Sequence, residues 1–183
     1  MLKKNPIFTP RGLVTMALFI AVSIVLSRFC VIWITNSIRI SFGNIPIFLA
    51  GILFGPVAGG VVGGLSDIIG SGLLSGLGWY PPLTISPVLI GVLSGFLRVL
   101  ILKKLTYPRT LAVVLLPNIA ASMLCTTYLL HTLYGTPFPA LLAVRVPLYG
   151  AIAIAESFII YHLCKSKLFT TLHVWPREGS YEH

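Results

Sequence analysis

The sequence predicts an all-α integral membrane protein, folded as a single bundle of six transmembrane helices. Of its 183 residues, 56% are hydrophobic and only 9% are charged, whereas a soluble domain carries about 25% charged residues. Residues 40–66, 68–97 and 110–144 contain no Asp, Glu, Lys or Arg. Each run is longer than the ~20 apolar residues that a spanning helix needs. Six such helices take up about 120 residues, so we expect no separate soluble domain in this chain.

The boundaries of the expected helices follow from the apolar stretches and from the Gly and Pro residues that separate them. These helices are expected at about residues 13–29, 44–54, 57–74, 84–102, 111–131 and 140–164. Pro46 is tolerated in the first turn of the second helix, and the adjacent Gly55 and Pro56 end that helix. The polar stretch of residues 33–43 is expected to form a loop or a short strand pair.

The net charge of +9 is concentrated at the ends of the helices. Nine of the thirteen basic residues lie at three boundaries: Lys3, Lys4, Arg11, Lys103, Lys104, Arg109, Lys165, Lys167 and Arg177. Under the positive-inside rule, this predicts cytoplasmic tails at 1–12 and 166–183 and a membrane domain at 13–165. A nucleic-acid groove would need a continuous basic stripe with stacking aromatics, and none is visible in the sequence.

Sequence motifs for covalent or metal-dependent chemistry are absent. There is no HExxH, no Walker lysine loop and no GxSxG, and four acidic residues provide few metal ligands. Three widely spaced cysteines fit neither a disulfide framework nor a zinc site. We therefore expect no enzymatic activity, no catalytic residues, no metal and no cofactor. A channel is also disfavoured, because no ring of filter residues is present.

Four ionisable residues fall near the outer ends of the predicted helices: Arg28, Arg39, Asp67 and Arg145. A charge at mid-depth in a bilayer costs at least about 2.5–3.5 kcal/mol, so such residues are functional candidates. Three arginines less one aspartate give +2, and a guanidinium holds a carboxylate or phosphate through two hydrogen bonds. We expect an anion-binding pocket. The alternative is that Arg28 snorkels to the headgroups and Asp67 pairs with one arginine.

Uncharged polar and aromatic residues lie at the same level of the bundle. Thr84, Ser86 and Tyr128 are expected to complete the binding pocket. Trp79 and Tyr80 fit an interfacial aromatic belt better. The second carboxylate within the predicted bundle, Glu156, lies deeper and is expected to be structural.

Small residues repeat every fourth position in three of the helices. Gly55, Gly59 and Gly63 form one row, and Gly91 and Gly95 form another. Such rows let helix backbones approach closely, and we expect them to pack inside the bundle. The first helix carries the pair Ala17 and Ala21, for which a surface that contacts a partner protein is an open alternative.

Three stretches of the sequence resemble a known family. Residues 27–70 read SRFCVIWITNSIRISFGNIPIFLAGILFGPVAGGVVGGLSDIIG and contain RISFG-x-IPI, AG-x-LFGP and SD-x-IG. The others are YPPLTIS at residues 80–86 and LYGTPFPALLAVR at residues 133–145. They resemble the substrate-binding S components of energy-coupling factor (ECF) vitamin transporters, in particular the folate branch. The resemblance covers most of residues 13–160.

The resemblance implies a six-helix protein of the bacterial plasma membrane that captures a vitamin from outside the cell for ATP-driven uptake. Its implied partners are a membrane scaffold subunit and two cytoplasmic ATPase subunits. It also implies that an AxxxA motif, matched by Ala17 and Ala21, contacts the scaffold. For a folate ligand, the arginines would neutralise the two carboxylates of the glutamate tail. Asp67 would accept the paired N–H donors of the pterin ring.

Other interpretations stay open on this evidence. Another anionic vitamin or cofactor precursor fits the same pocket, and a stand-alone carrier or a membrane scaffold protein fits the same helices. The chain also departs from the folate-branch pattern at two places. Pro82 and Leu83 stand where Pro-Gly-Phe is usual, and Leu148 stands where a lysine is common. The second departure predicts one cation fewer near the pocket.

Overall fold

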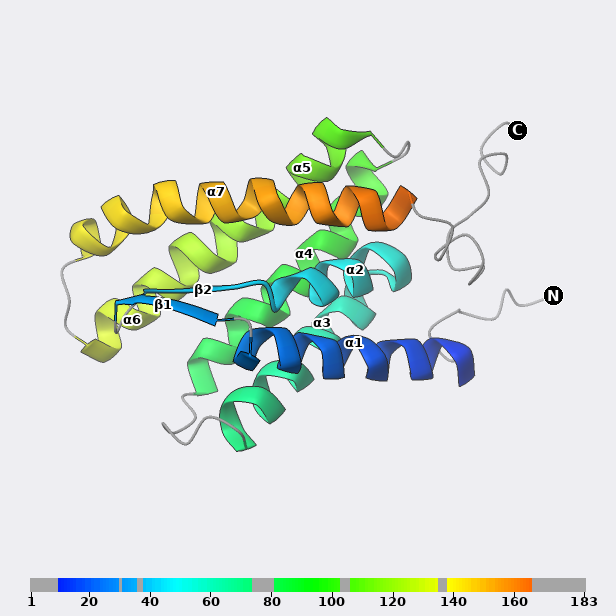
Figure 1. The fold of residues 1–183 in the computed structure, drawn as a ribbon, viewed down its shortest axis with the longest axis horizontal. Coiled ribbons are helices and arrows are strands. Elements are labelled where there is room, and N and C mark those ends of the chain that lie inside the picture. The colour runs from blue at the N-terminus through cyan, green and yellow to red at the C-terminus, as the bar shows by residue number, and fades with distance from the viewer. Residues whose placement is uncertain are drawn as a thin grey trace.

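The fold was obtained as a computed structural model, which describes residues 10–29, 31–35, 38–73, 81–102, 106–134 and 138–165. The elements in these ranges are α1 (Pro10–Phe29), β1 (Val31–Thr35), β2 (Ile38–Ser41), α2 (Asn44–Phe54), α3 (Pro56–Asp67), η2 (Ile68–Leu73), η3 (Pro81–Thr84), α4 (Ile85–Ile101), α5 (Tyr107–Pro117), η4 (Asn118–Cys125), α6 (Thr126–Tyr134) and α7 (Phe138–Lys165). The segments η2 and η4 are π-helical and continue α3 and α5 directly. The described helices therefore join into six continuous segments (Figure 1), which confirms the predicted helical bundle.

The polar stretch after α1 forms the expected strand pair. Strands β1 and β2 are antiparallel, with Trp33 opposite Arg39 and an irregularity in register between Trp33 and Thr35. This hairpin lies beside the start of α2 and toward the start of α7 (Figure 1). We call this end of the bundle the hairpin end.

Among the described residues, four helical segments are long and apolar enough to cross a membrane: Gly12–Phe29, Pro81–Ile101, Tyr107–Thr132 and Arg145–Lys165. Helix α2 is apolar but has only 11 residues, or about 16 Å, which is about half the thickness of the hydrocarbon core. Residues 45–54 are all buried, so α2 is a central element. Gly55 ends it at a φ of 97°, a conformation that favours glycine, and α3 begins at Pro56.

Helices α2, α3 and α4 pack backbone against backbone through glycines. A Cβ atom added to Gly59 would overlap the carbonyl of Gly91, and one added to Gly91 would overlap the backbone of Gly59. A Cβ atom on Gly95 would likewise overlap the backbone of Pro56. The rows of small residues predicted from the sequence therefore pack inside the bundle, as expected. These contacts make α2, α3 and α4 a tight unit.

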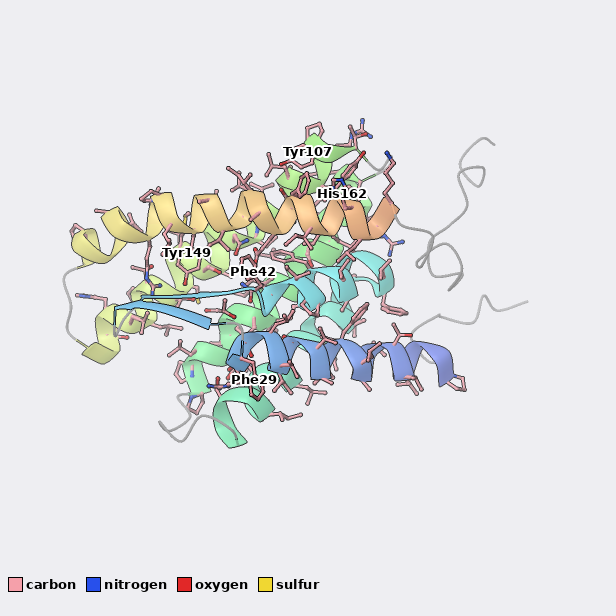
Figure 2. All side chains as sticks on the ribbon, viewed as in Figure 1. Phe29, Phe42, Tyr107, Tyr149 and His162 are labelled. Atoms are coloured by element: carbon pink, nitrogen blue, oxygen red, sulfur yellow. The ribbon has the colours of Figure 1, made fainter. Side chains whose placement is uncertain are left out.

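Helices α5 and α7 pack on each other at the end opposite the hairpin. The rings of Tyr107 and Tyr161 meet edge to face with centroids 5.8 Å apart, and the Lys165 Nζ lies 5.9 Å from the Tyr161 centroid. Figure 2 shows Tyr107 and His162 at this end, whereas Tyr149 lies on α7 toward the hairpin. The bundle therefore has a basic, aromatic end and, opposite it, the hairpin end that holds the site described next.

Candidate binding site

A cavity of about 260 Å³ lies between α1, α2, α3, α4, η4 and α7, next to the hairpin. Nine hydroxyl side chains line it: Ser23, Ser27, Ser41, Ser66, Ser71, Ser86, Ser122, Thr126 and Tyr149. Arg28, Asp67, Arg145 and Asn44 also line it. A cavity this polar, within helices this apolar, requires a polar occupant, because buried polar groups need hydrogen-bond partners.

Asp67 is held on one wall of the cavity by two hydroxyl groups. Thr84 donates to Oδ2 at 2.7 Å and Ser71 donates to Oδ1 at 3.0 Å. Each carboxylate oxygen accepts more than one hydrogen bond, so both oxygens keep acceptor capacity for a ligand. Asp67 ends α3, at the junction with the π-helical segment η2. Such π segments occur frequently at functional sites.

Arg28 is fixed beside Asp67 by the same π-helical segment. Its Nη2 donates to the carbonyl of Gly70, and also to the Ser71 hydroxyl at 3.3 Å. Because Ser71 donates in turn to Asp67, one hydroxyl joins the cation and the carboxylate. Arg28 therefore faces the cavity in a fixed position, with five N–H donors to distribute between protein and ligand.

Arg145 enters the cavity from α7 and is only 2% exposed. Its Nη1 donates to the Thr127 hydroxyl at 3.4 Å, and its guanidinium carbon lies 5.6 Å from the centre of the Tyr149 ring. Arg28 and Arg145 less Asp67 give the described cavity a formal charge of +1. The site is therefore electropositive before any ligand enters.

The floor of the cavity rests on a chain of polar groups. Thr126 and Ser86 hydrogen-bond at 2.8 Å and join α6 to α4. Ser122 donates to Asn118 at 3.2 Å, and Asn118 donates to Glu156 at 3.0 Å. Glu156 is fully buried and is joined to the cavity through this chain.

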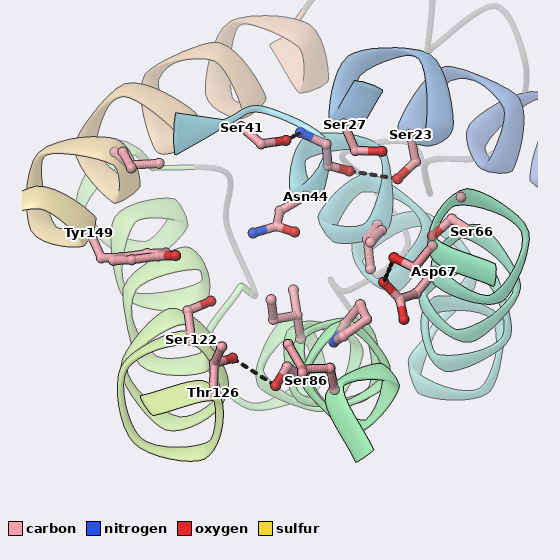
Figure 3. A pocket seen from close by; sticks show the side chains of 18 of the residues that line it. Ser23, Ser27, Ser41, Asn44, Ser66, Asp67, Ser86, Ser122, Thr126 and Tyr149 are labelled. Carbon is pink, nitrogen blue, oxygen red and sulfur yellow. Dashed lines mark hydrogen bonds between the residues drawn. The ribbon is translucent and has the colours of Figure 1, made fainter. Parts of the chain in front are cut away.

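Two side chains face the open centre of the cavity. Figure 3 shows Asn44 projecting inward from the start of α2 and the Tyr149 ring projecting inward from α7. Within the described part of the chain, neither the Asn44 amide nor the Tyr149 hydroxyl has a hydrogen-bond partner. Both groups are therefore available to a ligand.

The structure brings together four of the seven substrate-binding residues predicted from the sequence. Arg28, Asp67, Ser86 and Arg145 line the cavity. Thr84 does not line it, but supports it by donating to Asp67.

The remaining two predicted residues are Tyr128 and Arg39. Tyr128 is 62% exposed and is not among the cavity residues, because Thr126 and Leu130 take the positions of α6 that line the cavity. Arg39 lies in β2, but its side chain lies outside the described residues.

Sequence reasoning missed Asn44, Ser122 and Thr126 as site residues. Asn44 follows directly after the RISFG element, and its position at the start of an apolar helix is a signal that could have identified it. Among the described residues, no group of three His, Cys, Asp or Glu side chains is placed to hold a metal ion.

Comparisons with known proteins agree with this arrangement. A family described as the S component of ECF-type riboflavin transporters matches residues 8–167. The chain belongs to the ECF S components. This S component is 30% identical over 149 residues to the folate transporter FolT of Clostridium novyi (strain NT), covering 81% of this chain and 85% of that protein.

Solved structures of S components share the fold. The crystal structure of FolT bound with folic acid matches this S component with a TM-score of 0.74 and 27% identity, covering 85% of this chain and 93% of that one. The S component for biotin from an ECF-type ABC transporter matches with a TM-score of 0.67 and 23% identity, covering 84% and 90%. At this identity, the second match shows the fold alone.

Proposed function

We propose that this S component binds folate or a reduced folate from outside a bacterial cell, as the vitamin-binding subunit of an ECF-type ABC importer. The observation that carries the proposal is the convergence of Arg28, Arg145 and Asp67 on one cavity. The similarity to FolT supports the same ligand. The subunit acts by binding and release, with no catalytic step of its own.

Folate carries the groups that such a cavity requires. Its glutamate tail has two carboxylates, which guanidinium groups hold through paired hydrogen bonds. Its pterin ring has an amine next to a ring N–H, and this pair suits the two oxygens of Asp67. The Tyr149 ring offers a face for stacking. The cavity is slightly smaller than the ~300–1,000 Å³ of ligand pockets.

Riboflavin is the second candidate, because the matching family carries its name. Its hydroxylated chain would suit the nine hydroxyl groups of the cavity. Riboflavin is uncharged, however, and would leave both guanidinium groups of the cavity without an anion at a membrane-embedded site, which is costly. The charges therefore favour folate.

Isothermal titration of the purified protein tests the choice of ligand. We expect folic acid to bind in a one-to-one complex and riboflavin to give no measurable heat at the same concentration. Mass spectrometry of small molecules that co-purify with the protein provides an independent reading. Tight binding of riboflavin with no binding of folic acid would refute the proposal.

Asp67→Asn is expected to weaken the binding of both folic acid and 6-hydroxymethylpterin by about 10- to 100-fold, because the carboxamide keeps only one acceptor oxygen, now uncharged, and has an NH2 donor in place of the other. The glutamate-side fragment p-aminobenzoylglutamate should be affected little. Titration of the variant with the three compounds measures this pattern. If the variant instead loses affinity for p-aminobenzoylglutamate alone, Asp67 contacts the glutamate end of the ligand and not the pterin ring.

The proposed function also implies protein partners for this subunit and an orientation in the membrane. We propose that Ala17 and Ala21, both exposed on α1, contact the membrane scaffold subunit, which in turn carries the two ATPases. We also propose that both termini are cytoplasmic, with residues 1–12 and 166–183 as tails of the membrane domain 13–165. Arg98, Arg109 and Lys165 lie at the ends of helices opposite the hairpin, which supports this orientation by the positive-inside rule.

Cysteine labelling of whole cells tests the orientation. With the three native cysteines replaced by serine, Thr132→Cys at the end of α6 should react with an impermeant maleimide. Thr106→Cys, just before α5, should react only after the cells are opened. Both positions are exposed, so access to each depends on its side of the membrane. Labelling of position 106 alone in intact cells would invert the topology.

A further inference from the structure

We propose that Asn44 allows this S component to accept both the oxidised and the reduced pterin ring, an inference that rests on the proposed function. Asn44 is the first residue of α2 and lines the cavity. Its carboxamide projects toward the open centre (Figure 3). Within the described residues the carboxamide has no hydrogen-bond partner, so its donor and acceptor are both directed at the ligand.

The neighbours of Asn44 explain why it is the adaptable group of the site. Ser23 donates to the carbonyl of Gly43 at 2.7 Å, and Gly43 donates to the Ser41 hydroxyl at 3.2 Å. These bonds hold the backbone on which Asn44 stands. On the facing wall, Asp67 is restricted to accepting hydrogen bonds by its charge. Asn44, by contrast, both donates and accepts.

The pterin ring changes its hydrogen-bonding pattern with oxidation state. Once Asp67 has taken the 2-amino group and the N3–H, the remaining ring edges present N5 and N8. Both atoms are acceptors in folic acid, and both carry a hydrogen in tetrahydrofolate. A rotation of the Asn44 carboxamide by 180° exchanges its Nδ2 donor for its Oδ1 acceptor. One side chain therefore serves both forms of the ring, whichever of these edges lies next to it.

Asn44→Asp tests the inference, because it keeps the shape of the side chain but removes the donor. Titration with folic acid and with tetrahydrofolate, kept reduced by a thiol, gives the ratio of the two affinities. We expect the variant to lose about 100-fold in affinity for folic acid and less than about 10-fold in affinity for tetrahydrofolate. The ratio should therefore shift by at least about 10-fold toward the reduced ligand.

Two controls isolate the contact with the ring. The added negative charge repels the glutamate tail of both ligands equally, and p-aminobenzoylglutamate measures that effect while also showing that the variant folds. Thr132→Asp adds the same charge at an exposed position outside the cavity and should leave the ratio unchanged. Asn44→Leu, which is apolar and of similar size, should weaken both pterin ligands by about 10-fold and leave their ratio near that of the wild type.

The outcomes separate this inference from the proposed function. If the wild-type protein fails to bind folic acid, both fall together. If the wild type binds folic acid and Asn44→Asp keeps the wild-type ratio within about twofold, the inference alone is overturned, because the carboxamide then does not contact the part of the ring that changes.

Discussion

Replacing Arg145 with alanine is expected to weaken folic acid binding by about 30-fold or more, the largest loss expected for any arginine of the cavity. Truncating one partner of a buried, hydrogen-bonded charge pair costs about 2–5 kcal/mol. Arg145 meets that condition, because it is 2% exposed and lies on a membrane-spanning helix. Water reaches the site poorly and cannot replace the lost guanidinium.

The pattern across ligand fragments distinguishes a binding role from a folding role. Arg145→Ala should strongly weaken the binding of folic acid and of p-aminobenzoylglutamate. It should have little effect on the binding of 6-hydroxymethylpterin, and isothermal titration measures all three affinities. Arg109→Ala removes an exposed arginine near the start of α5, outside the cavity, and should leave all three affinities unchanged. Equal, small losses for every fragment would mean that Arg145 serves folding or topology.

Replacing Ala21 with tryptophan is expected to abolish folate uptake by cells while leaving folic acid binding to the purified subunit intact. Ala21 lies one turn from Ala17, and both are exposed on α1. A close crossing of two helices has no room for an indole ring. Radiolabelled folate uptake and titration of the same variant measure the two quantities.

A tryptophan placed elsewhere on the lipid-facing surface controls for the bulk of the side chain. Ala151 is exposed on α7, and Ala151→Trp should retain uptake. If Ala21→Trp lowers folic acid binding along with uptake, the alanines pack against the bundle itself and the scaffold contact lies elsewhere.

Residue types alone predicted much of the bundle and half of the site. Charges are so costly in an apolar segment that the positions of Arg28, Asp67 and Arg145 in the sequence were enough to indicate one shared pocket. The glycine rows predicted the close packing of α3 and α4 for a similar reason, because few other residues permit it.

The rest depended on helix phase, which the sequence does not reveal. Each π-helical turn takes in about one residue more than an α-helical turn, which rotates everything after it by about 100°. The segment η4 ends at Cys125, three residues before Tyr128. A prediction that assumes an unbroken α-helix therefore assigns Tyr128 to the wrong face of the helix. Asn44 was missed for another reason, because asparagine at a helix start is also a common cap.

The short central helix has an electrostatic consequence for the cavity. Gly43 and Asn44, at the start of α2, line the site, so the amino end of the helix faces any bound ligand. The aligned peptide dipoles of a helix place about half a positive charge at that end. This contribution comes from the backbone and survives every side-chain substitution. Variants that lack one or both arginines should therefore still prefer an anion over a neutral molecule of the same shape.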